Sequence, residues 1–380
     1  MSLAALATTS RTGGPAIWTM FVADRTGVRQ AQIDIYESAE IIARANDVGT
    51  WTITLPTNTD AGRILATDTF ARVEIAVDDS TWRSGPVTHL ERTVDMDGDM
   101  LQVSGVDDLV WLARRFASPT PASTGPPYPD AYYVDTGPVG EVVGRLVNVN
   151  AGPGAVAARR VPGLTVPPPG PVGPAVTVWA RFQTLLTLCQ DLARPSGLLF
   201  DVVDLTYRAT MPVDRGAVFS AGLETLGAWT MTTEAASANV VLVAGQGEGA
   251  ERMLRVVTDP TSIATWGWAE QFQDRRDTPD PNQLVQAGTE TLADAVTPTT
   301  VVFEPLDTDG QTFGRDWTLG DIVTVYAGKL TVHDQIREVH VTLDEHGATV
   351  IPSVGKPAGD LALFRSLAGL DRRVRQLERV

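Results

Sequence analysis

The feature that most constrains the fold is a two-residue alternation near the end of the sequence, between Arg315 and Gly355. Side-chain character alternates from Ile322 to Tyr326, and again from Ile336 to Leu343. Successive side chains of a strand point to opposite faces, so this period indicates strands with two differently solvated faces. Turn residues at 327–329 and 344–347 separate the strands. The segment therefore predicts a three-stranded antiparallel meander that stops at Pro352.

After Pro357 and Gly359 the pattern changes to a heptad. Apolar residues recur four and three positions apart, at Leu363, Leu367, Leu370, Val374 and Leu377. Such a short seam does not persist alone in water, because helix nucleation is costly. One interpretation is an amphipathic helix docked on its own domain. The other, which we adopt as the hypothesis, is a self-associating bundle on a symmetry axis, in which these five residues mediate oligomerisation.

Composition excludes several classes of function. The chain has 380 residues, of which 43% are hydrophobic and 20% charged, as in ordinary globular proteins. It contains no apolar run near the roughly 18 residues of a membrane span and no signal peptide, so synthesis in a reducing cytoplasm is expected. The single cysteine, Cys189, excludes an intrachain disulfide and is expected to be buried. The formal charge of −16 argues against a surface that binds duplex nucleic acid.

The predicted fold is mainly β with an α/β middle: two barrel-like β domains flank a small mixed domain, and a short coiled-coil helix follows. Helices are expected over 139–149, 179–193 and 281–296, and a strand over 266–272. No fixed-period repeat is visible. The predicted domains are an N-terminal arm (1–16), a β-barrel-like domain (17–117), a Pro/Gly-rich linker with a small α/β domain (118–235), a second β-rich domain (236–357) and the heptad helix (358–380).

Motifs that suggest chemistry have structural explanations. Gly245 to Ala250 matches a dinucleotide fingerprint, but a strand follows where a helix is required, so we interpret it as a glycine-rich hairpin. Asp95, Asp97 and Asp99 resemble the start of a calcium loop, yet the glycine and glutamate of that loop are missing. The four histidines lack metalloprotease spacing. We therefore predict no catalytic, cofactor-binding or metal-binding residue and no enzymatic activity.

Several short stretches, taken in order, resemble one family. They are Gly49 to Pro56, Ser84 to Val87, Val103 to Asp108, Asn148 to Ala155, Gly245 to Gly249 and Asp316 to Asp321. Together they resemble the tail-tip hub proteins, often labelled minor tail proteins, of siphophages that infect actinobacteria. The resemblance covers about residues 17–355.

The resemblance implies a structural virion protein located at the tail tip and assembled in the host cytoplasm. Such hubs are similar to trimeric baseplate hubs, in which two barrel-like domains per subunit form a pseudo-sixfold ring that matches the tail tube. The implied partners are further copies of the chain in a homotrimer, the distal tail protein, the tape measure protein, tip or fibre proteins, and genomic DNA that passes through without specific binding. No membrane anchor is implied.

Two further expectations follow. The sequence carries neither a fibre module nor a lytic module of the kind found in larger relatives, so digestion of the host wall is not expected. The alternative function is a receptor-binding or carbohydrate-binding tip protein, with a wall-degrading version included, that uses surface aromatics such as Trp266 and Trp268. An acidic ring would let DNA slide through without adhering, because like charges repel.

Overall fold

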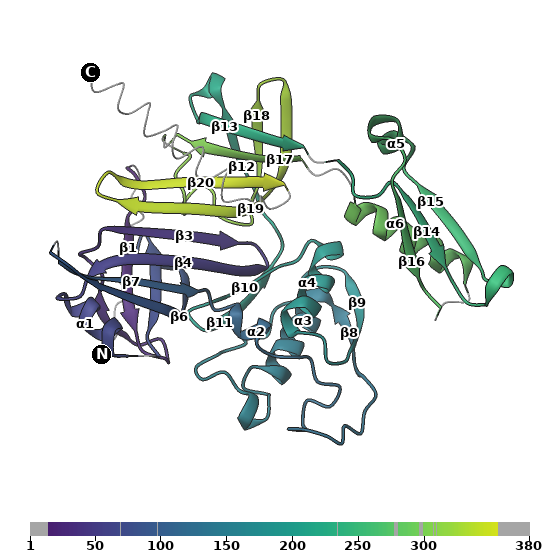
Figure 1. Ribbon diagram of the computed structural model, residues 1–380, viewed down its shortest axis with the longest axis horizontal. Coiled ribbons are helices and arrows are strands. Elements are labelled where there is room, and N and C mark those ends of the chain that lie inside the picture. The colour runs from purple at the N-terminus through teal and green to yellow at the C-terminus, as the bar shows by residue number, and fades with distance from the viewer. Residues whose placement is uncertain are drawn as a thin grey trace, which may run out of the picture. The chain divides into compact units, whose positions relative to one another are not determined.

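The computed structural model describes residues 14–355, apart from positions 69, 97, 234, 277–279, 296–298, 307 and 309. The chain divides into two compact units, one formed by Met1–Trp229 with Val302–Val380 and the other by Thr230–Val301 (Figure 1). Strands predominate over helices, which confirms the predicted mainly β class. The described residues contain no helix long and apolar enough to cross a membrane.

The larger unit begins with a β region and ends with another. The first holds β1 (Trp18–Ala23), β2 (Arg29–Gln32), β3 (Ser38–Arg44), β4 (Asp47–Pro56), α1 (Asp60–Thr67), β5 (Arg72–Val77), β6 (Ser80–Val94) and β7 (Asp99–Val106). The second holds β12 (Asp214–Ser220), β13 (Leu226–Thr233), β17 (Thr299–Pro305), β18 (Ile322–Ala327), β19 (Leu330–Asp344) and β20 (Gly347–Gly355). Strands β18, β19 and β20 pair antiparallel, which confirms the meander predicted from the alternation. The predicted stop at Pro352 is wrong, because β20 continues to Gly355 and Pro352 lies opposite Val339 within the pairing.

The two β regions are not separate domains, which corrects the predicted division between 17–117 and 236–357. Strand β19 pairs antiparallel with β3, in a register that places Val341 opposite Ile41. Among the described residues this pairing joins thirteen strands into one sheet (Figure 1). The physical reason is that pairing between strands far apart in sequence leaves no trace in the local periodicity of either.

The two β regions repeat one topology. The first, called here the first repeat, has the strand order β1-β5-β6-β7-β4-β3, and the second repeat has the order β12-β18-β19-β20-β17-β13. Strand for strand, the positions match in both space and chain order. One difference is that β1 pairs antiparallel with β5, whereas β12 pairs parallel with β18. This repeat was not visible in the sequence.

An aromatic cluster joins the two repeats. Trp18 of β1 stacks on Phe313 at 5.6 Å between ring centroids, and Trp82 of β6 meets the same ring edge-on at 5.3 Å. Phe313 in turn contacts Trp317, which is 1% exposed. Aromatic rings of this size bury large apolar areas and dominate the energetics of such contacts. The motif residue Trp317 is therefore a core residue.

The segment between the repeats is the expected α/β unit. It contains α2 (Val110–Ala113), β8 (Tyr133–Pro138), α3 (Val139–Asn150), η1 (Ala157–Arg159), β9 (Ala175–Ala180), α4 (Leu185–Ser196), β10 (Leu199–Val203), β11 (Thr206–Thr210) and, after β12, η2 (Ala221–Leu223). Cys189 is fully buried among the apolar faces of α3 and α4, as predicted.

The predicted helix over 179–193 begins too early. Trp179 lies in β9, and the helix starts after Thr184, whose hydroxyl accepts a hydrogen bond from the Thr187 amide. A capping threonine is a stronger start signal than apolar spacing alone, because it satisfies an otherwise unpaired amide of the first turn. The helix ends at Gly197, which adopts the left-handed conformation (φ 70°) that favours glycine.

A buried polar junction fixes the first repeat to this α/β segment. The Asp108 carboxylate accepts hydrogen bonds from Arg72, from the Ser84 hydroxyl at 2.6 Å and from the Trp111 indole at 3.1 Å. Burial raises the pKa of Asp108, although the Arg72 guanidinium opposes that rise. The adjacent Asp107 accepts from the Gly49 amide at 2.8 Å. Three of the stretches that carry the family resemblance therefore meet at one structural junction.

The smaller unit is a sheet covered on one face by a helix. Strand β14 (Val240–Ala244) lies between β15 (Leu254–Thr258), antiparallel to it, and β16 (Glu270–Asp274), parallel to it. The unit also contains η3 (Gly249–Glu251), α5 (Pro260–Trp266) and α6 (Pro281–Ala295). Leu284 and Ala287 of α6 pack on Val241 and Val243. The predicted strand over 266–272 is wrong at its start, because Trp266 ends a helix that Asp259 caps.

Candidate functional site

The two repeats place β6 and β19 in equivalent surroundings. Each strand is 15 residues long, and each follows a strand of six residues. The hairpins β6–β7 and β19–β20 agree pair for pair, including a bulge at the same position. The corresponding pairs are Val87↔Gly105 and Ile336↔Val354, His89↔Ser104 and Glu338↔Ser353, Arg92↔Leu101 and Val341↔Val350, and Val94↔Asp99 and Leu343↔Ala348.

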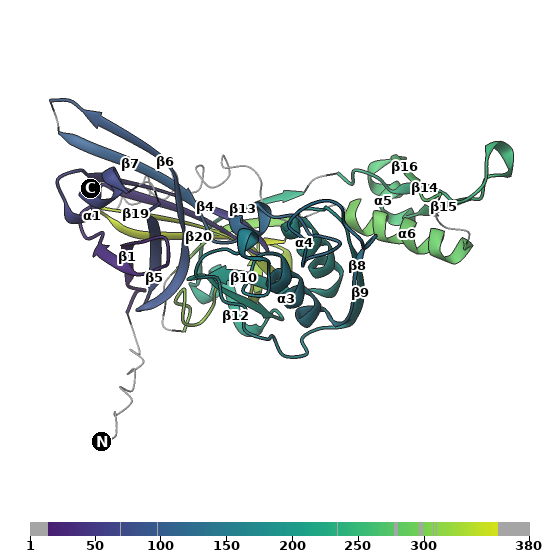
Figure 2. The same ribbon diagram turned by 90° about the horizontal axis from the view of Figure 1, so that it is seen from below.

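The outer edges of these two strands differ. From Glu338 to Leu343, β19 pairs with β20 on one side and with β3 on the other. From Thr88 to Val94, β6 pairs with β7 alone, and within the described residues no strand lies along its other edge. An unpaired strand edge presents backbone N–H and C=O groups that can pair with another chain. The far end of the β6–β7 hairpin projects from the body of the larger unit (Figure 2).

The side chains on the covered edge of β19 are less exposed than those on the open edge of β6. Val339 and Leu343 on the covered edge are buried, whereas Leu90 and Val94 at the corresponding positions on β6 are 38% and 68% exposed. The Arg92 guanidinium is bound to the Asp99 carboxylate, with its Nε 2.8 Å from Oδ1. This pairing lowers the pKa of Asp99 to about 2, with a further contribution from the Thr57 hydroxyl. Charged side chains on an edge protect it from indiscriminate pairing.

A second strand with an open edge lies at the end of the sheet. In the described part of the chain, β13 pairs with β17 only. It occupies the place in the second repeat that β3 occupies in the first. Trp229 and Met231 of β13 are 39% and 42% exposed. Within the described residues, β6 and β13 each therefore have one edge without a paired strand.

The second candidate feature is the polar face of the sheet. Register and alternation place Glu40, Thr52, Ser104, Glu91 and Thr342 on the side opposite the buried core residues. The Thr52 and Ser104 hydroxyls are 3.0 Å apart across neighbouring strands. Hydroxyls and carboxylates thus run across β6, β7, β4, β3 and β19.

Basic side chains on this face lie against acidic ones. The Nε of Arg44 donates to Glu338 at 2.7 Å, and His340 Nε2 lies 2.9 Å from Glu40. Burial raises the pKa of Glu338, while the Arg44 guanidinium opposes that rise. Because acids on the face outnumber its one arginine, a polyanion passing across it would meet repulsion with little compensating attraction.

The residues predicted to mediate oligomerisation, Leu363, Leu367, Leu370, Val374 and Leu377, lie outside the described residues. Asp97 also lies outside them. Asp95 accepts from the Gly98 amide at 3.1 Å and Asp99 binds Arg92, so these two acids hold the hairpin in shape. The sheet edge and the polar face escaped sequence reasoning, although the matching lengths of the strands on either side of 78–79 and 328–329 are a signal that could have revealed the repeat.

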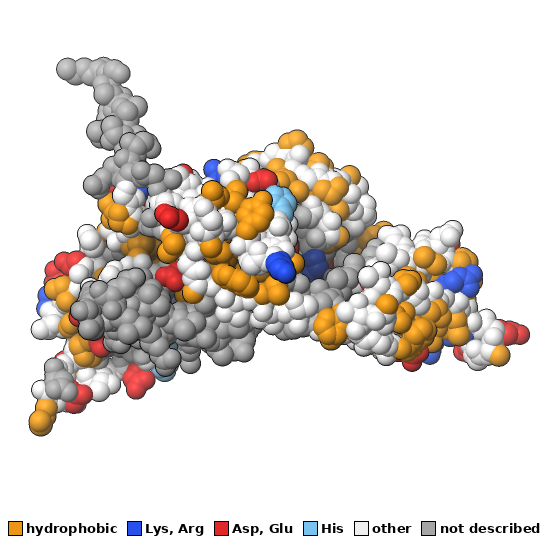
Figure 3. Space-filling model, turned by 90° about the horizontal axis from the view of Figure 1, so that it is seen from above, with side chains coloured by type: hydrophobic (Ala, Val, Ile, Leu, Met, Phe, Trp, Pro, Cys, Tyr) orange, Lys and Arg blue, Asp and Glu red, His pale blue; other side chains and the backbone are white. Residues whose placement is uncertain are grey.

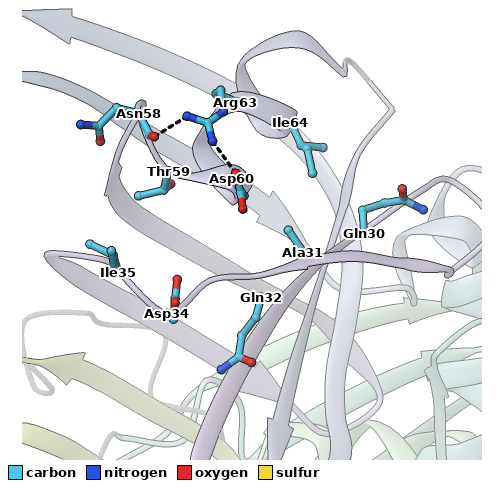
Figure 4. A pocket seen from close by; sticks show the side chains of 10 residues that line it. All are labelled: Gln30, Ala31, Gln32, Asp34, Ile35, Asn58, Thr59, Asp60, Arg63 and Ile64. Carbon is cyan, nitrogen blue, oxygen red and sulfur yellow. Dashed lines mark hydrogen bonds and ion pairs between the residues drawn. The ribbon is translucent and has the colours of Figure 1, made fainter.

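The motifs that suggested chemistry in the sequence lie largely within the described residues. Within them, no group of three or more His, Cys, Asp or Glu side chains could hold a metal ion. Gly245 to Ala250 connects the antiparallel strands β14 and β15, which confirms the hairpin interpretation. A groove beside α1 is lined by polar side chains from β2 and α1, and its Arg63 is occupied by Asp60 and the Asn58 carbonyl (Figure 4).

Several solved protein structures have a similar fold. The chain resembles the 43 kDa tail protein of prophage MuSo2 from Shewanella oneidensis, with 13% identity and a TM-score of 0.59 over 88% of this chain and 97% of that one. It also resembles a tail protein from Neisseria meningitidis MC58, with 14% identity and a TM-score of 0.55 over 89% and 96% of the two chains. A third similar structure is prophage tail protein gp18 from Listeria monocytogenes EGD-e, with 11% identity and a TM-score of 0.53 over 92% of this chain and 98% of that one.

At these identities the likeness shows a shared fold. A search of curated protein sequences finds no match. The sequence profile of a siphovirus tail-protein family, described as Siphovirus ReqiPepy6 Gp37-like protein, matches residues 19–356 and so covers most of the chain. The predicted resemblance to a siphophage tail family is thereby confirmed. The chain belongs to the family of siphovirus ReqiPepy6 Gp37-like proteins.

Proposed function

We propose that this phage tail protein is the structural hub of the tail tip, where copies of the chain form a homotrimeric ring that closes the tail tube. The observation that carries the proposal is the unequal covering of two equivalent edges, paired on β19 and open on β6. A chain that repeats one sheet and leaves one of two equivalent edges open is suited to join copies of itself head to tail, and such contacts close into rings.

The ring proposal is tested by the mass of the purified chain. Native mass spectrometry and light scattering at increasing concentration should give the mass of three copies, and chemical crosslinking should stop at that number. A chain that stays monomeric at high concentration would overturn the proposal. Trimer is the stoichiometry that the family resemblance implies, and a closed ring of another size would correct only this number.

We further propose that the polar face of the sheet lines a channel through which DNA is ejected. Its hydroxyls and carboxylates, including Glu40 and Glu91, would repel phosphate without binding it. Replacing both by arginine should slow ejection of DNA from assembled particles, and a Gln/Gln variant at the same sites separates loss of negative charge from gain of positive charge. Ejection at an unchanged rate in the arginine variant would remove the channel proposal.

The heptad residues stay a prediction, here as a trimeric seam that pins the ring axis. Substituting Leu370 and Leu377 by Asp should dissociate purified trimers, because charges at seam positions are not tolerated when buried. The proposed neighbours are the distal tail protein on one side, tip or fibre proteins on the other, and the tape measure protein within the tube. Pull-down of each partner with the purified ring tests these assignments one at a time.

A second candidate function rests on the smaller unit. The face of its sheet away from α6 is apolar: Leu242 of β14 pairs with Val256 and with Phe272, which are 58% and 57% exposed. Figure 3 shows hydrophobic side chains gathered on this unit. Trp266 and Trp268 nearby in the chain are 43% and 63% exposed. Binding to host wall polysaccharide, with an assay for new reducing ends, would favour a receptor-binding or wall-degrading role over the hub.

A further inference from the structure

We infer that β13 of one copy pairs antiparallel with the open edge of β6 in the next copy, so that the sheet continues from subunit to subunit. The inference rests on the proposed ring and names the contact that would close it. The structural basis is the repeat itself: in the second repeat, the outer edge of β19 is covered by β3, and β13 is the strand that corresponds to β3.

The backbone supplies the main attraction. Residues Thr88 to Val94 of β6 lie along one partner strand only, and the corresponding stretch of β19 lies between two. Adding a strand to an open edge satisfies a row of backbone donors and acceptors, and the alternating side chains give specificity. The exposed Leu90 and Val94 would pass from solvent to an apolar contact, as Val339 and Leu343 already do within the chain.

Other open strands fit this edge less well. Strand β2 ends the sheet on the opposite side, but it has four residues, three of them exposed and polar. Strand β12 corresponds to β1 in the repeat, whereas the strand that covers β19 is β3. Strand β13 has eight residues, with an alternating pattern of exposure that includes Trp229 and Met231. Its length and position are those that the edge requires.

The arrangement also explains why the edge is open in a single copy. The junction β3·β19 is made within one chain, and the junction β13·β6 would be made between chains. Three copies would then present six similar junctions around one axis, alternating between the two kinds. Because every β6 edge and every β13 edge would be paired once the ring closed, neither would remain to recruit further copies.

Disulfide crosslinking tests the contact directly. Thr93→Cys is combined, in three separate chains, with Cys at Ala228, Trp229 or Thr230, and each is oxidised after assembly. Facing strand residues lie about 4.5–5.5 Å apart between Cα atoms, a separation that a disulfide can bridge. The native Cys189 is fully buried, so it does not contribute. At least one combination should give covalent trimers on denaturing gels.

The chain provides a matched control. Thr342 and Glu40 face each other across the intrachain junction, so Thr342→Cys with Glu40→Cys should oxidise without any increase in mass. If native mass shows a ring but no Thr93 combination crosslinks, the inference is overturned and the proposed function stands. If the chain is monomeric in every measurement, both the proposed ring and the inferred β13·β6 contact are overturned.

A proline scan provides a second measurement that does not depend on the register. Adjacent strand residues direct their N–H groups to opposite sides, so of Glu91→Pro and Arg92→Pro one removes an N–H from the open edge and the other from the pairing with β7. The variant that alters the open edge should keep the circular dichroism and melting temperature of the parent but lose the oligomer. A ring that persists in both variants while each remains folded would overturn the inference.

Discussion

The hairpins β6–β7 and β19–β20 share length, register and bulge, yet one has an open edge and the other does not. At corresponding positions, β19 carries Val341 and β6 carries Arg92. The first is fully buried beside β3, and the second is exposed and bound to Asp99. The same backbone arrangement therefore occurs with two different strand edges. The edge with apolar side chains is buried within the chain, and the edge with a charged side chain is exposed.

On the proposed assembly, this difference shows how a chain can keep a strand edge available for a second copy. A junction within the chain forms as the protein folds, so its residues can be as apolar as any core. A junction between copies must remain soluble until a neighbour arrives, so it keeps charges and a short exposed edge. The predictions below exchange or remove the residues that set the two hairpins apart, from the largest expected effect to the smallest.

Exchanging the corresponding residues should have very unequal effects. Val341→Arg would place a charge without a partner in the β3·β19 junction and should lower the free energy of unfolding by about 5 kcal/mol or more, or prevent folding. Arg92→Val removes an exposed ion pair and should leave the free energy of unfolding nearly unchanged. Urea denaturation of both variants measures the change in the free energy of unfolding. Similar effects of the two substitutions would show that the edges are equivalent after all.

Removing the buried ion pair should come next in size. Asp108→Ala leaves Arg72, 3% exposed, without its carboxylate partner, and should cost about 3–5 kcal/mol of unfolding free energy. The junction belongs to the first repeat, which it fixes to the α/β segment. Asp60→Ala, which breaks the exposed pair with Arg63, is the matched control and should cost less than about 1 kcal/mol. A small loss in Asp108→Ala would mean that water enters this junction.

The sequence predicted the meander, the α/β middle, the buried Cys189 and helices α3 and α6, because these depend on local side-chain patterns and on start and stop signals. It did not predict that β3 pairs with β19, since alternation says which side chains are buried but not which strand lies beside them. The repeat was missed for a related reason. The corresponding residues Arg92 and Val341 differ in polarity because one edge is open and the other is covered by β3. The two hairpins are therefore alike in the register of their strands, and the sequence does not display that register.

The open edge of β6 could not be predicted from the sequence either, because strand pairing over long distances leaves no local pattern. An edge is open only in relation to the strands that are absent from it, and no single residue marks it. The stretches that carry the family resemblance turned out to be structural, as Asp108, Gly105 and Trp317 show. They predicted the family correctly because a fold imposes its tightest requirements at junctions and close approaches.

Close packing of the first repeat around Gly105 should be sensitive to one methyl group. A Cβ at this position would lie 2.1 Å from the Trp51 ring, whereas the corresponding residue of β20 is Val354. Gly105→Ala should therefore lower the free energy of unfolding by about 1–3 kcal/mol, because the core must shift to admit it. The exposed Gln102→Ala on the same strand should stay within about 0.5 kcal/mol. Thermal unfolding of the two variants makes the comparison, and a neutral Gly105→Ala would show that the indole moves freely.

The smallest expected effect is a pH dependence confined to the open hairpin. Asp99 is bound to Arg92, which lowers its pKa to about 2, while the corresponding residue beside β19 is Ala348. A carboxylate whose pKa is lowered on folding contributes stability that is present above its unfolded value, near 3.8, and that is lost as the pH falls through about 2. Carbon-detected NMR titration of the Asp99 carboxylate should give a midpoint near 2, and Arg92→Val should move it upward toward 3.8. The Thr57 hydroxyl, which also binds Asp99, should keep the midpoint of that variant below the unfolded value. An unmoved midpoint would mean that Arg92 does not hold Asp99, and the charge on this edge would then be free to meet an incoming strand.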